Sequence, residues 1–293
     1  MRGKYTVNEV EERTNVPAST LRQWERRYGF PMPERSESGY RMYSERDLRQ
    51  IEAMKRHIGD GVPASRAADL VQQLGVPSVG PRSVGQLTEE FVEALVALDD
   101  ERADHILSEA YALHPLETVM LELMQSAISD IGQRWHSGLI RTTTEHFASQ
   151  YIQGRLRELL KMSPHSKTAA AVIVACAPGD QHEIGALMLA VMLRRAGYRV
   201  YYIGADTPVA DLAEMAQTVQ PVAVMISAAT ALSVDRLRQE QLQSYTMAPL
   251  TVLGGAAFDA KPERAQALGG TYLGSNLVDL VARLRVLIED VKA

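Results

Sequence analysis

The chain reads AAAVIVACAPGDQHEIG over residues 169–185. The first nine of these residues are apolar, which is typical of a strand buried on both faces of a parallel sheet. The polar turn that follows carries Asp180, His182 and Gly185 in the pattern D-x-H-x-x-G. Since the turn lacks G-x-G-x-x-G, it does not carry the fingerprint of a nicotinamide or flavin dinucleotide site.

Apolar runs followed by helical patterns recur through the rest of the chain. The further runs lie at residues 200–203, 222–227, 250–253 and 271–273. Five strands alternating with helices predict an α/β domain with a doubly wound, five-stranded parallel sheet of the flavodoxin-like type. Such sheets bind ligands beyond the carboxyl ends of their strands, where Asp180 and His182 fall. There the Asp180 carboxylate can accept one ring N–H of His182 and strengthen the other ring nitrogen as a metal ligand.

The length and composition indicate a multidomain protein. The chain has 293 residues, of which 46% are hydrophobic, and this is enough for two or three separate cores. Gly and Pro break the periodic patterning after the first 75 residues and again shortly before the sheet. We therefore expect three domains, at residues 1–75, 86–161 and 168–293. The middle domain has helical periodicity throughout and a single proline, which predicts a four-helix bundle.

Cysteine content, apolar runs and charge exclude several classes of protein. Cys176 is the only cysteine and lies in an apolar run, so a disulfide framework is excluded and a thiolate zinc site is not expected. The apolar runs are too short to cross a bilayer and the basic N-terminus leads into no signal region, so we expect a cytoplasmic protein with no membrane partner. The net charge is −5, but residues 1–75 hold 13 Lys and Arg against 11 Asp and Glu. The positive end of the chain is therefore the N-terminal one.

The N-terminal domain has the pattern of a helix-turn-helix followed by a hairpin. Pro17 opens the second helix at residues 18–28, residues 29–43 favour a hairpin, and Ser44 caps the next helix. Side chains of this helix and hairpin can neutralise phosphates and hydrogen-bond base edges of DNA. These are Ser19, Thr20, Arg22, Gln23 and Arg26 on the helix and Arg35, Tyr40, Arg41 and Tyr43 on the hairpin. The alternative is a solvated charged face, because glutamates are interspersed among them.

The order of these motifs resembles the MerR family of regulators, which use a winged helix-turn-helix. The resemblance rests on TLRQWERRYG at residues 20–29 and GYRMY at residues 39–43. It implies that the second helix enters the major groove of double-stranded operator DNA and that the hairpin grips the backbone as a wing. The residues that inherit contact roles are Arg22, Arg26, Arg41 and Tyr43. Trp24 is expected in the core instead.

The resemblance stops short of the family's dimerisation helix. Many MerR relatives continue into a long antiparallel coiled coil, whereas here a Gly/Pro stretch begins at Gly75. We therefore expect the C-terminal domains to hold copies of the chain together. A change in their association would then change how many DNA-binding domains are tethered, which is worth roughly 10²- to 10⁴-fold in apparent affinity.

The C-terminal domain resembles the cobalamin-binding domain. Besides Asp180, His182 and Gly185, the resemblance rests on Ser227 at the end of the third apolar run and on the pair Gly254 and Gly255 after the fourth. It implies that His182 is the lower axial cobalt ligand in place of the cofactor's own benzimidazole. It also implies that the nucleotide tail passes the serine and the glycine pair. The chain departs from the family's S-x-L in having Ser227-Ala-Ala229, which leaves the packing around the tail open.

The middle domain resembles the CarH-type adenosylcobalamin-dependent photoreceptors. The resemblance rests on Trp135, nine intervening residues, and then Glu145 and His146. It implies that the bundle caps the upper face of the corrin, that Trp135 packs against the adenosyl group and that Glu145 hydrogen-bonds it. The position beside the tryptophan, His136, would ligate cobalt after light breaks the cobalt–carbon bond.

Each of these bundle residues also has an ordinary structural interpretation. Trp135 could belong to the bundle core, and the two histidines could be half-buried imidazoles. Thr142 and Glu145 have the spacing of a capping box, so Glu145 could be the partner of a helix cap. The three resemblances together favour the functional interpretation.

Together the resemblances predict a light-responsive transcriptional repressor and not an enzyme. In the dark, adenosylcobalamin would join bundle and sheet and favour a dimer or tetramer that occupies operator DNA; light would remove the adenosyl group and dissolve the assembly. One alternative is a corrinoid methyl-carrier or mutase-type subunit, against which stand the DNA-binding domain and the lack of chain length for a catalytic barrel. The other is a cobalamin-independent MerR-like regulator that keeps the C-terminal domains for oligomerisation alone.

Overall fold

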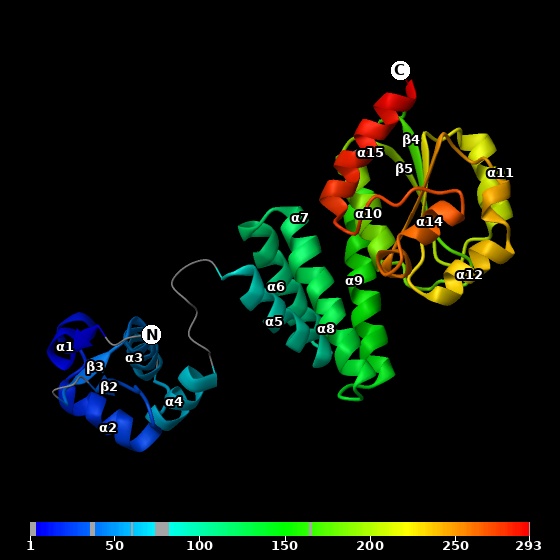
Figure 1. Cartoon of the computed structure of the whole chain (residues 1–293). Coiled ribbons are helices and arrows are strands. Elements are labelled where there is room, and N and C mark those ends of the chain that lie inside the picture. Colours follow the sequence, from blue (N-terminus) through cyan, green and yellow to red (C-terminus); the bar gives the residue numbers. More distant parts are fainter. Residues whose placement is uncertain (1–3, 36–38, 60, 74–81, 164–165, 293) are drawn as a thin grey trace. The chain divides into compact units, whose positions relative to one another are not determined.

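The computed structural model describes residues 4–35, 39–59, 61–73, 82–163 and 166–292. These residues form two compact units, Met1–Arg82 and Ser83–Ala293, which are described separately (Figure 1). Most of the Gly/Pro stretch expected between the first two domains, residues 74–81, lies outside the described residues. No helix in the described ranges has the length and apolar character needed to cross a membrane.

The first unit is the predicted helix-turn-helix with its hairpin. Its elements are β1 (Tyr5–Thr6), α1 (Val7–Thr14), α2 (Ala18–Tyr28), β2 (Glu34–Arg35), β3 (Arg41–Tyr43), α3 (Glu45–Gly59) and α4 (Ala64–Gln73). Thr6 and Glu9 form a capping box at the start of α1. Ser44 and Asp47 bond each other reciprocally at the start of α3, which confirms the predicted cap. The strands pair antiparallel in the order β1-β3-β2 and so tie the hairpin to the entry of α1.

The core of this unit forms around α2. Leu21 and Trp24 are buried, and the Trp24 ring stacks on Phe30 with centroids 6.2 Å apart. This confirms that Trp24 is a core residue. The arginines of α2 lie on the opposite, exposed face of the same helix.

The second unit begins with a four-helix bundle, as predicted. The helices are α5 (Val84–Val96), α6 (Asp100–Leu113), the continuous run α7 (Leu116–Thr118), η1 (Val119–Met124) and α8 (Gln125–His136), and α9 (Thr142–Met162). The segment η1 is π-helical, a form that occurs mostly as short turns inside α-helices. Its buried side chains, including Met120 and Leu123, still point into the bundle core with Phe91.

The sheet has four parallel strands in the order β5-β4-β6-β7. They are β4 (Ala171–Cys176), β5 (Arg199–Gly204), β6 (Ala223–Ser227) and β7 (Leu250–Gly254). The helices that follow are α10 (Ile184–Arg195), α11 (Val209–Val219), α12 (Ala231–Gln239), α13 (Ala256–Asp259), α14 (Glu263–Ala267) and α15 (Leu277–Lys292), with a 3-10 turn η2 (Leu242–Ser244). Alternate residues of β4 pack on opposite layers, so α10 and α15 cover one face and α11 and α12 the other (Figure 1).

The expected fifth strand at residues 271–273 is reduced to one parallel bridge between Thr271 and Val252. The physical reason is its glycines. A side chain at Gly270 would lie 2.6 Å from Leu253, and Gly274 has a φ of +98°, so the chain approaches β7 at one residue and then turns away. Leu273 packs into the core instead of extending a strand.

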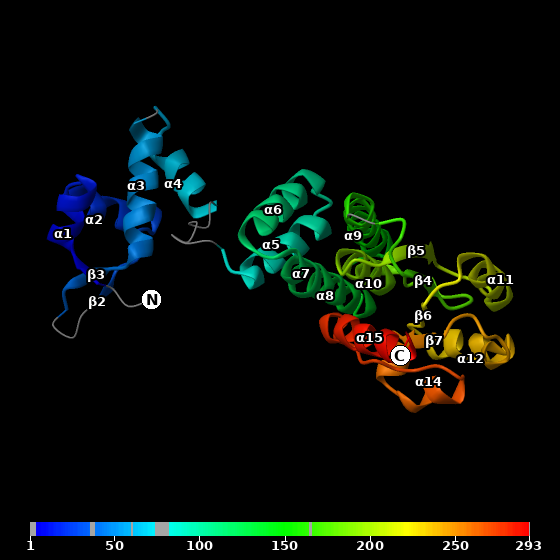
Figure 2. The ribbon, with the colours of Figure 1, turned by 90° about the horizontal axis from the view of Figure 1, so that it is seen from above.

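The hydrophobic core of the bundle extends onto α10 of the sheet domain. Helix α9 lies alongside α10, as Figures 1 and 2 show from two directions. Leu187, Met188 and Val191 of α10 belong to the same buried cluster as the bundle core. The bundle is therefore held against the carboxyl side of β4, where the candidate site lies.

Candidate functional site

A cavity of about 840 Å³ lies between the bundle and the loops after β4, β6 and β7. Helices α8 and α9 form its roof, and the start of α10 and the strand ends form its floor. The residues predicted for a cofactor that line it are Trp135, Glu145, His146, His182, Gly185, Ser227, Gly254 and Gly255. The folding of the chain thus brings together residues that are up to 120 positions apart in the sequence.

Asp180 supports His182 from behind the cavity. The Nδ1–H of His182 donates to Oδ1 of Asp180 at 2.9 Å, and the backbone N–H of His182 donates to the same oxygen at 3.0 Å. Asp180 is only 2% exposed, whereas the His182 side chain is 69% exposed. Because Nδ1 carries the proton, the lone pair of the neutral ring lies on Nε2, which is the arrangement of a metal ligand.

The charge of Asp180 is fixed by hydrogen bonds. Burial alone would raise its pKa, but donors from the His182 side chain and the backbone N–H of Ala229 outweigh burial and lower the pKa to about 2. The hydrogen bond to Asp180 in turn raises the pKa of His182. The pair is therefore a carboxylate that remains ionised beside an imidazole of increased basicity.

Ala229 has a role that sequence reasoning missed. Its backbone N–H donates to Oδ2 of Asp180 at 2.5 Å, and the buried Ser233 adds a further hydrogen bond to Asp180. The departure from the family's leucine at position 229 leaves this contact intact, because the backbone makes it. A backbone donor has no signature in the sequence.

The two adjacent glycines of the floor serve different purposes. A Cβ at Gly255, where φ is +94°, would lie 2.6 Å from the Ala228 carbonyl oxygen, so the backbone itself requires glycine there. A Cβ at Gly254 or Gly185 would meet no atom of the described residues within 4 Å. Both of these glycines line the cavity and so leave space that a side chain would fill.

The roof presents an indole and a carboxylate. Trp135 is 43% exposed, which excludes the interpretation that it belongs to the bundle core. Its indole N–H donates to the Thr142 hydroxyl at 3.1 Å. The Glu145 carboxylate accepts the Ser149 hydroxyl at 2.6 Å and pairs with Nδ1 of His146 at 2.7 Å.

The capping box predicted from Thr142 and Glu145 is wrong. The cap residue of α9 is Arg141, which makes no side-chain cap, and Thr142 already lies in the first helical turn with its hydroxyl engaged by Trp135. Glu145 is thus not a capping partner.

His136 lies outside the cavity lining. Its exposed imidazole packs edge-on against Trp135, with ring centroids 6.2 Å apart. It is therefore adjacent to the roof of the cavity without being part of it.

The first unit has a separate hollow on the exposed face of α2. Five of the residues predicted to contact DNA line it: Ser19, Arg22, Gln23, Arg26 and Arg41. Glu25 orients the guanidinium of Arg41, since its carboxylate accepts Nε–H at 2.8 Å and an Nη2–H at 3.4 Å. Thr20 is half-buried outside the hollow, and Arg35 and Tyr40 are exposed on the hairpin.

The predicted contact from Tyr43 needs correction. Its side chain is fully buried in the core of the first unit, and its hydroxyl has no hydrogen-bond partner among the described residues. Burial and the neighbouring charge of Glu25 raise its pKa. Tyr43 contributes packing, and its side chain cannot reach DNA from this position.

Comparison with known proteins relates each part of the chain to a protein family. The family model "MerR HTH family regulatory protein" matches residues 5–74, and two models described as "B12 binding domain" match residues 87–160 and 170–275. The HTH-type transcriptional repressor CarH of Myxococcus xanthus is 33% identical over 271 residues, which are 86% of this chain and 89% of that protein. The repressor CarA of the same organism is 29% identical over 275 residues, 92% of this chain and 93% of that protein.

A solved structure supports the fold of the second unit. The monomethylamine corrinoid protein of Methanosarcina barkeri covers 70% of this chain and 100% of its own, with a TM-score of 0.55 and 19% identity. At this identity the likeness concerns the fold alone.

Proposed function

This chain belongs to the B12-binding, MerR-type transcriptional repressors, the family of CarH and CarA, and on that basis we propose that it is a light-responsive repressor whose chromophore is adenosylcobalamin. Repression by a B12-binding MerR-type regulator, rather than catalysis, is the function of the family. The observation that carries the finer proposal is that Trp135 and Glu145 of the bundle line the same cavity as His182 of the sheet domain.

The residues present fit a corrinoid. The floor offers one imidazole with its lone pair on Nε2, and Gly185 and Gly254 leave open space beside it. The volume of about 840 Å³ is in the upper range for cofactor cavities. In the proposal His182 holds the cobalt, Trp135 and Glu145 contact the adenosyl group, and Ser227 and Gly254 lie beside the nucleotide tail.

When bound, adenosylcobalamin would supply a cobalt–carbon bond that light breaks. In the dark, contacts of Trp135, Glu145 and His182 with the bound cofactor would keep bundle and sheet in one arrangement. Without the adenosyl group, Trp135 would lose its partner, and the adjacent His136 would be free to move toward the cavity. The two arrangements differ in their contacts with the ligand, as any ligand-biased switch requires.

In the proposal, the affinity for operator DNA depends on how many copies of the chain associate. The proposal is that the dark arrangement forms a dimer or tetramer, which tethers several copies of the α2 face that carries Arg22, Gln23 and Arg26. Dissolving the assembly removes the gain from tethering, roughly 10²- to 10⁴-fold in apparent affinity. Operator DNA is then released and transcription resumes.

The experiment compares purified full-length chain with adenosylcobalamin in the dark and after illumination. The absorption spectrum, the elution volume in gel filtration and the affinity for operator DNA are all expected to change on illumination, and His182→Ala is expected to lose the dark spectrum. If elution is the same in dark and light, the switching part of the proposal is wrong. If the protein stays colourless with every corrinoid, the cofactor part is wrong.

The two alternatives make different predictions. A methyl carrier would transfer a methyl group from bound methylcobalamin to a partner protein. A cobalamin-independent regulator would bind operator DNA equally well with and without cobalamin in the dark.

A further inference from the structure

A buried carboxylate connects the bundle to the loop that carries His182. Glu183 follows His182 directly and is 8% exposed. One of its carboxylate oxygens accepts the Arg157 guanidinium of α9, and the other accepts the Tyr202 hydroxyl of β5 at 2.7 Å. The two donors thus come from different domains, Arg157 from the bundle and Tyr202 from the sheet.

Glu183 depends on both donors. A buried carboxylate without partners is costly, so its side chain keeps this position only while it is paired. Burial and the hydrogen bond to Glu183 raise the pKa of Tyr202, which therefore remains a donor at neutral pH. The other partner of Glu183 is the Arg157 guanidinium. The Arg157 side chain is about half exposed, so it is the less constrained of the two donors.

Glu183 and His182 belong to one short turn at the start of α10. Glu183 is the N-cap residue of α10, and its backbone N–H donates to the Gln181 carbonyl at 3.1 Å. The segment from Gln181 to Glu183 is therefore a tight turn in which His182 is the middle residue. The peptide that carries the imidazole is thus joined directly to the residue whose side chain pairs with Arg157 and Tyr202.

We infer that Arg157 is a positioning residue, which acts through Glu183 to set the place of the His182 imidazole and so connects the roof of the cavity to the ligand on its floor. The inference rests on the proposed corrinoid binding. No motif of the sequence points to Arg157, because its partner is 26 positions away and in another domain.

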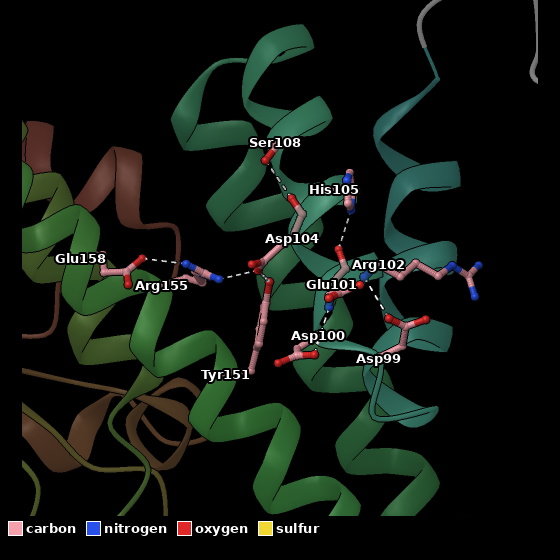
Figure 3. Close-up of polar contacts among 10 residues, drawn as sticks. All are labelled: Asp99, Asp100, Glu101, Arg102, Asp104, His105, Ser108, Tyr151, Arg155 and Glu158. Carbon is pink, nitrogen blue, oxygen red and sulfur yellow. Dashed lines mark hydrogen bonds and ion pairs between the residues drawn. The ribbon is translucent and has the colours of Figure 1, made fainter.

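Helix α9 provides a matched control. Arg155, two residues before Arg157, pairs with Asp104 of α6, which also accepts the Tyr151 hydroxyl, and with Glu158 at 2.9 Å (Figure 3). Among the described residues, this network lies within the bundle and includes no residue of the His182 loop. Arg155→Gln therefore removes an arginine ion pair from the same helix without touching the proposed connection.

A second control tests the contact between the domains in general. Arg195 of α10 pairs with Glu117 of α7 at 2.9 Å, and so also joins sheet domain to bundle. Arg195 lies twelve residues beyond Glu183, about 18 Å along the helix. Arg195→Gln thus removes an interdomain ion pair far from the loop.

The first experiment uses the cofactor-free full chain. Hydrogen–deuterium exchange in residues 177–185 is expected to be faster in Arg157→Gln and Glu183→Gln than in the wild type. In the conservative Arg157→Lys, exchange is expected to be slower than in Arg157→Gln. Arg155→Gln and Arg195→Gln are expected to exchange at the wild-type rate there. Equal acceleration in all variants, or none in Arg157→Gln, would overturn the inference.

The second experiment adds adenosylcobalamin in the dark. Arg157→Gln is expected to bind about tenfold more weakly and to show less of the spectrum of imidazole-coordinated cobalt, since partners that orient a metal ligand typically contribute 10- to 100-fold. Wild-type affinity and spectrum in Arg157→Gln would contradict the inference. If the wild type itself binds no corrinoid, the proposed function fails, and the exchange experiment still decides whether Arg157 orders the loop.

Discussion

Asp180 binds His182 twice through a single carboxylate oxygen, which accepts the ring Nδ1–H at 2.9 Å and the backbone N–H at 3.0 Å. The carboxylate therefore fixes both the orientation of the ring and the place of the loop. Its second oxygen is held by Ala229.

Asp180→Asn tests this support. The amide lacks the charge that increases the basicity of His182, so corrinoid affinity is expected to fall by about 10- to 100-fold. Titration followed by absorbance measures the change. Asp206→Asn is the control, because Asp206 accepts the N–H of Gly179 in the same loop and its amide oxygen can still do so. A loss of equal size in both variants would contradict a specific role for Asp180.

Trp135→Ala tests the roof. Removing the indole is expected to weaken adenosylcobalamin binding in the dark by about tenfold or more, since burying an aromatic side chain is worth roughly 1.5–3 kcal/mol. Binding of hydroxocobalamin, which has no upper nucleoside, is expected to be unchanged. Leu139→Ala serves as the control, because Leu139 is exposed nearby and does not line the cavity. If binding of both corrinoids were weakened equally, Trp135 would not contact the adenosyl group.

Gly254 and Gly255 are expected to respond in opposite ways. Gly255→Ala forces a Cβ against the Ala228 carbonyl at positive φ, so the free energy of unfolding is expected to fall by about 1–3 kcal/mol. Gly254→Val fills open cavity space, so stability is expected to be kept while corrinoid binding is lost. Urea denaturation and absorbance titration of both variants separate the two effects. Retained binding in Gly254→Val would show that the ligand does not use this space.

Tyr43→Phe tests the correction at the hairpin. The variant removes a buried hydroxyl that has no hydrogen-bond partner in the described part of the chain, so stability is expected to be unchanged or to rise by up to about 1 kcal/mol, with DNA affinity unchanged. Arg22→Ala is expected to weaken DNA binding and to reduce the slope of log affinity against log salt by about one. A loss of DNA affinity in Tyr43→Phe at full stability would restore the contact predicted from the sequence.

The Asp104 network predicts a pH dependence. The hydrogen bond from Tyr151, which outweighs burial, and the pairing with Arg155 lower the pKa of Asp104 below its ordinary 3.8. A lowered carboxyl pKa stabilises the fold at neutral pH, and this contribution is lost as the pH falls through the lowered value. Asp104→Asn is therefore expected to be less stable than the wild type at pH 7, by about 1 kcal/mol or less because Asp104 is half exposed, and to approach it in acid. Urea denaturation at several pH values measures this, and a difference that does not depend on pH would contradict it.

Most of the helices and strands could be predicted, because the residues that start or form them act on their own segment of the chain. Pro17 and Ser44 mark helix starts whatever surrounds them, and the apolar runs identify β4 to β7 by length and hydrophobicity. The fifth strand could not be predicted in the same way, because pairing at Thr271 depends on how closely Gly270 approaches β7. The face on which Tyr43 lies was equally unpredictable, since a strand of three residues has too little alternation to show which side is buried.

The candidate site was predictable only in part. The sequence placed His182 at the correct edge of the sheet, and the family resemblance added Trp135 and Glu145 from a different domain. The link from Arg157 to Glu183 and the donor from Ala229 have no local signal, because one joins two domains and the other is backbone.

The side chains of α10 that belong to the bundle core limit how the bundle can move when the ligand beneath α8 and α9 changes. Pulling the helical cap away from the sheet would expose Leu187, Met188 and Val191 to water, which is far costlier than tilting or sliding the cap over them. We therefore expect a change of ligand to alter the angle between bundle and sheet and not to separate them. A change of that angle would shift the outer surface of the bundle relative to that of the sheet domain, and with it any surface that spans both.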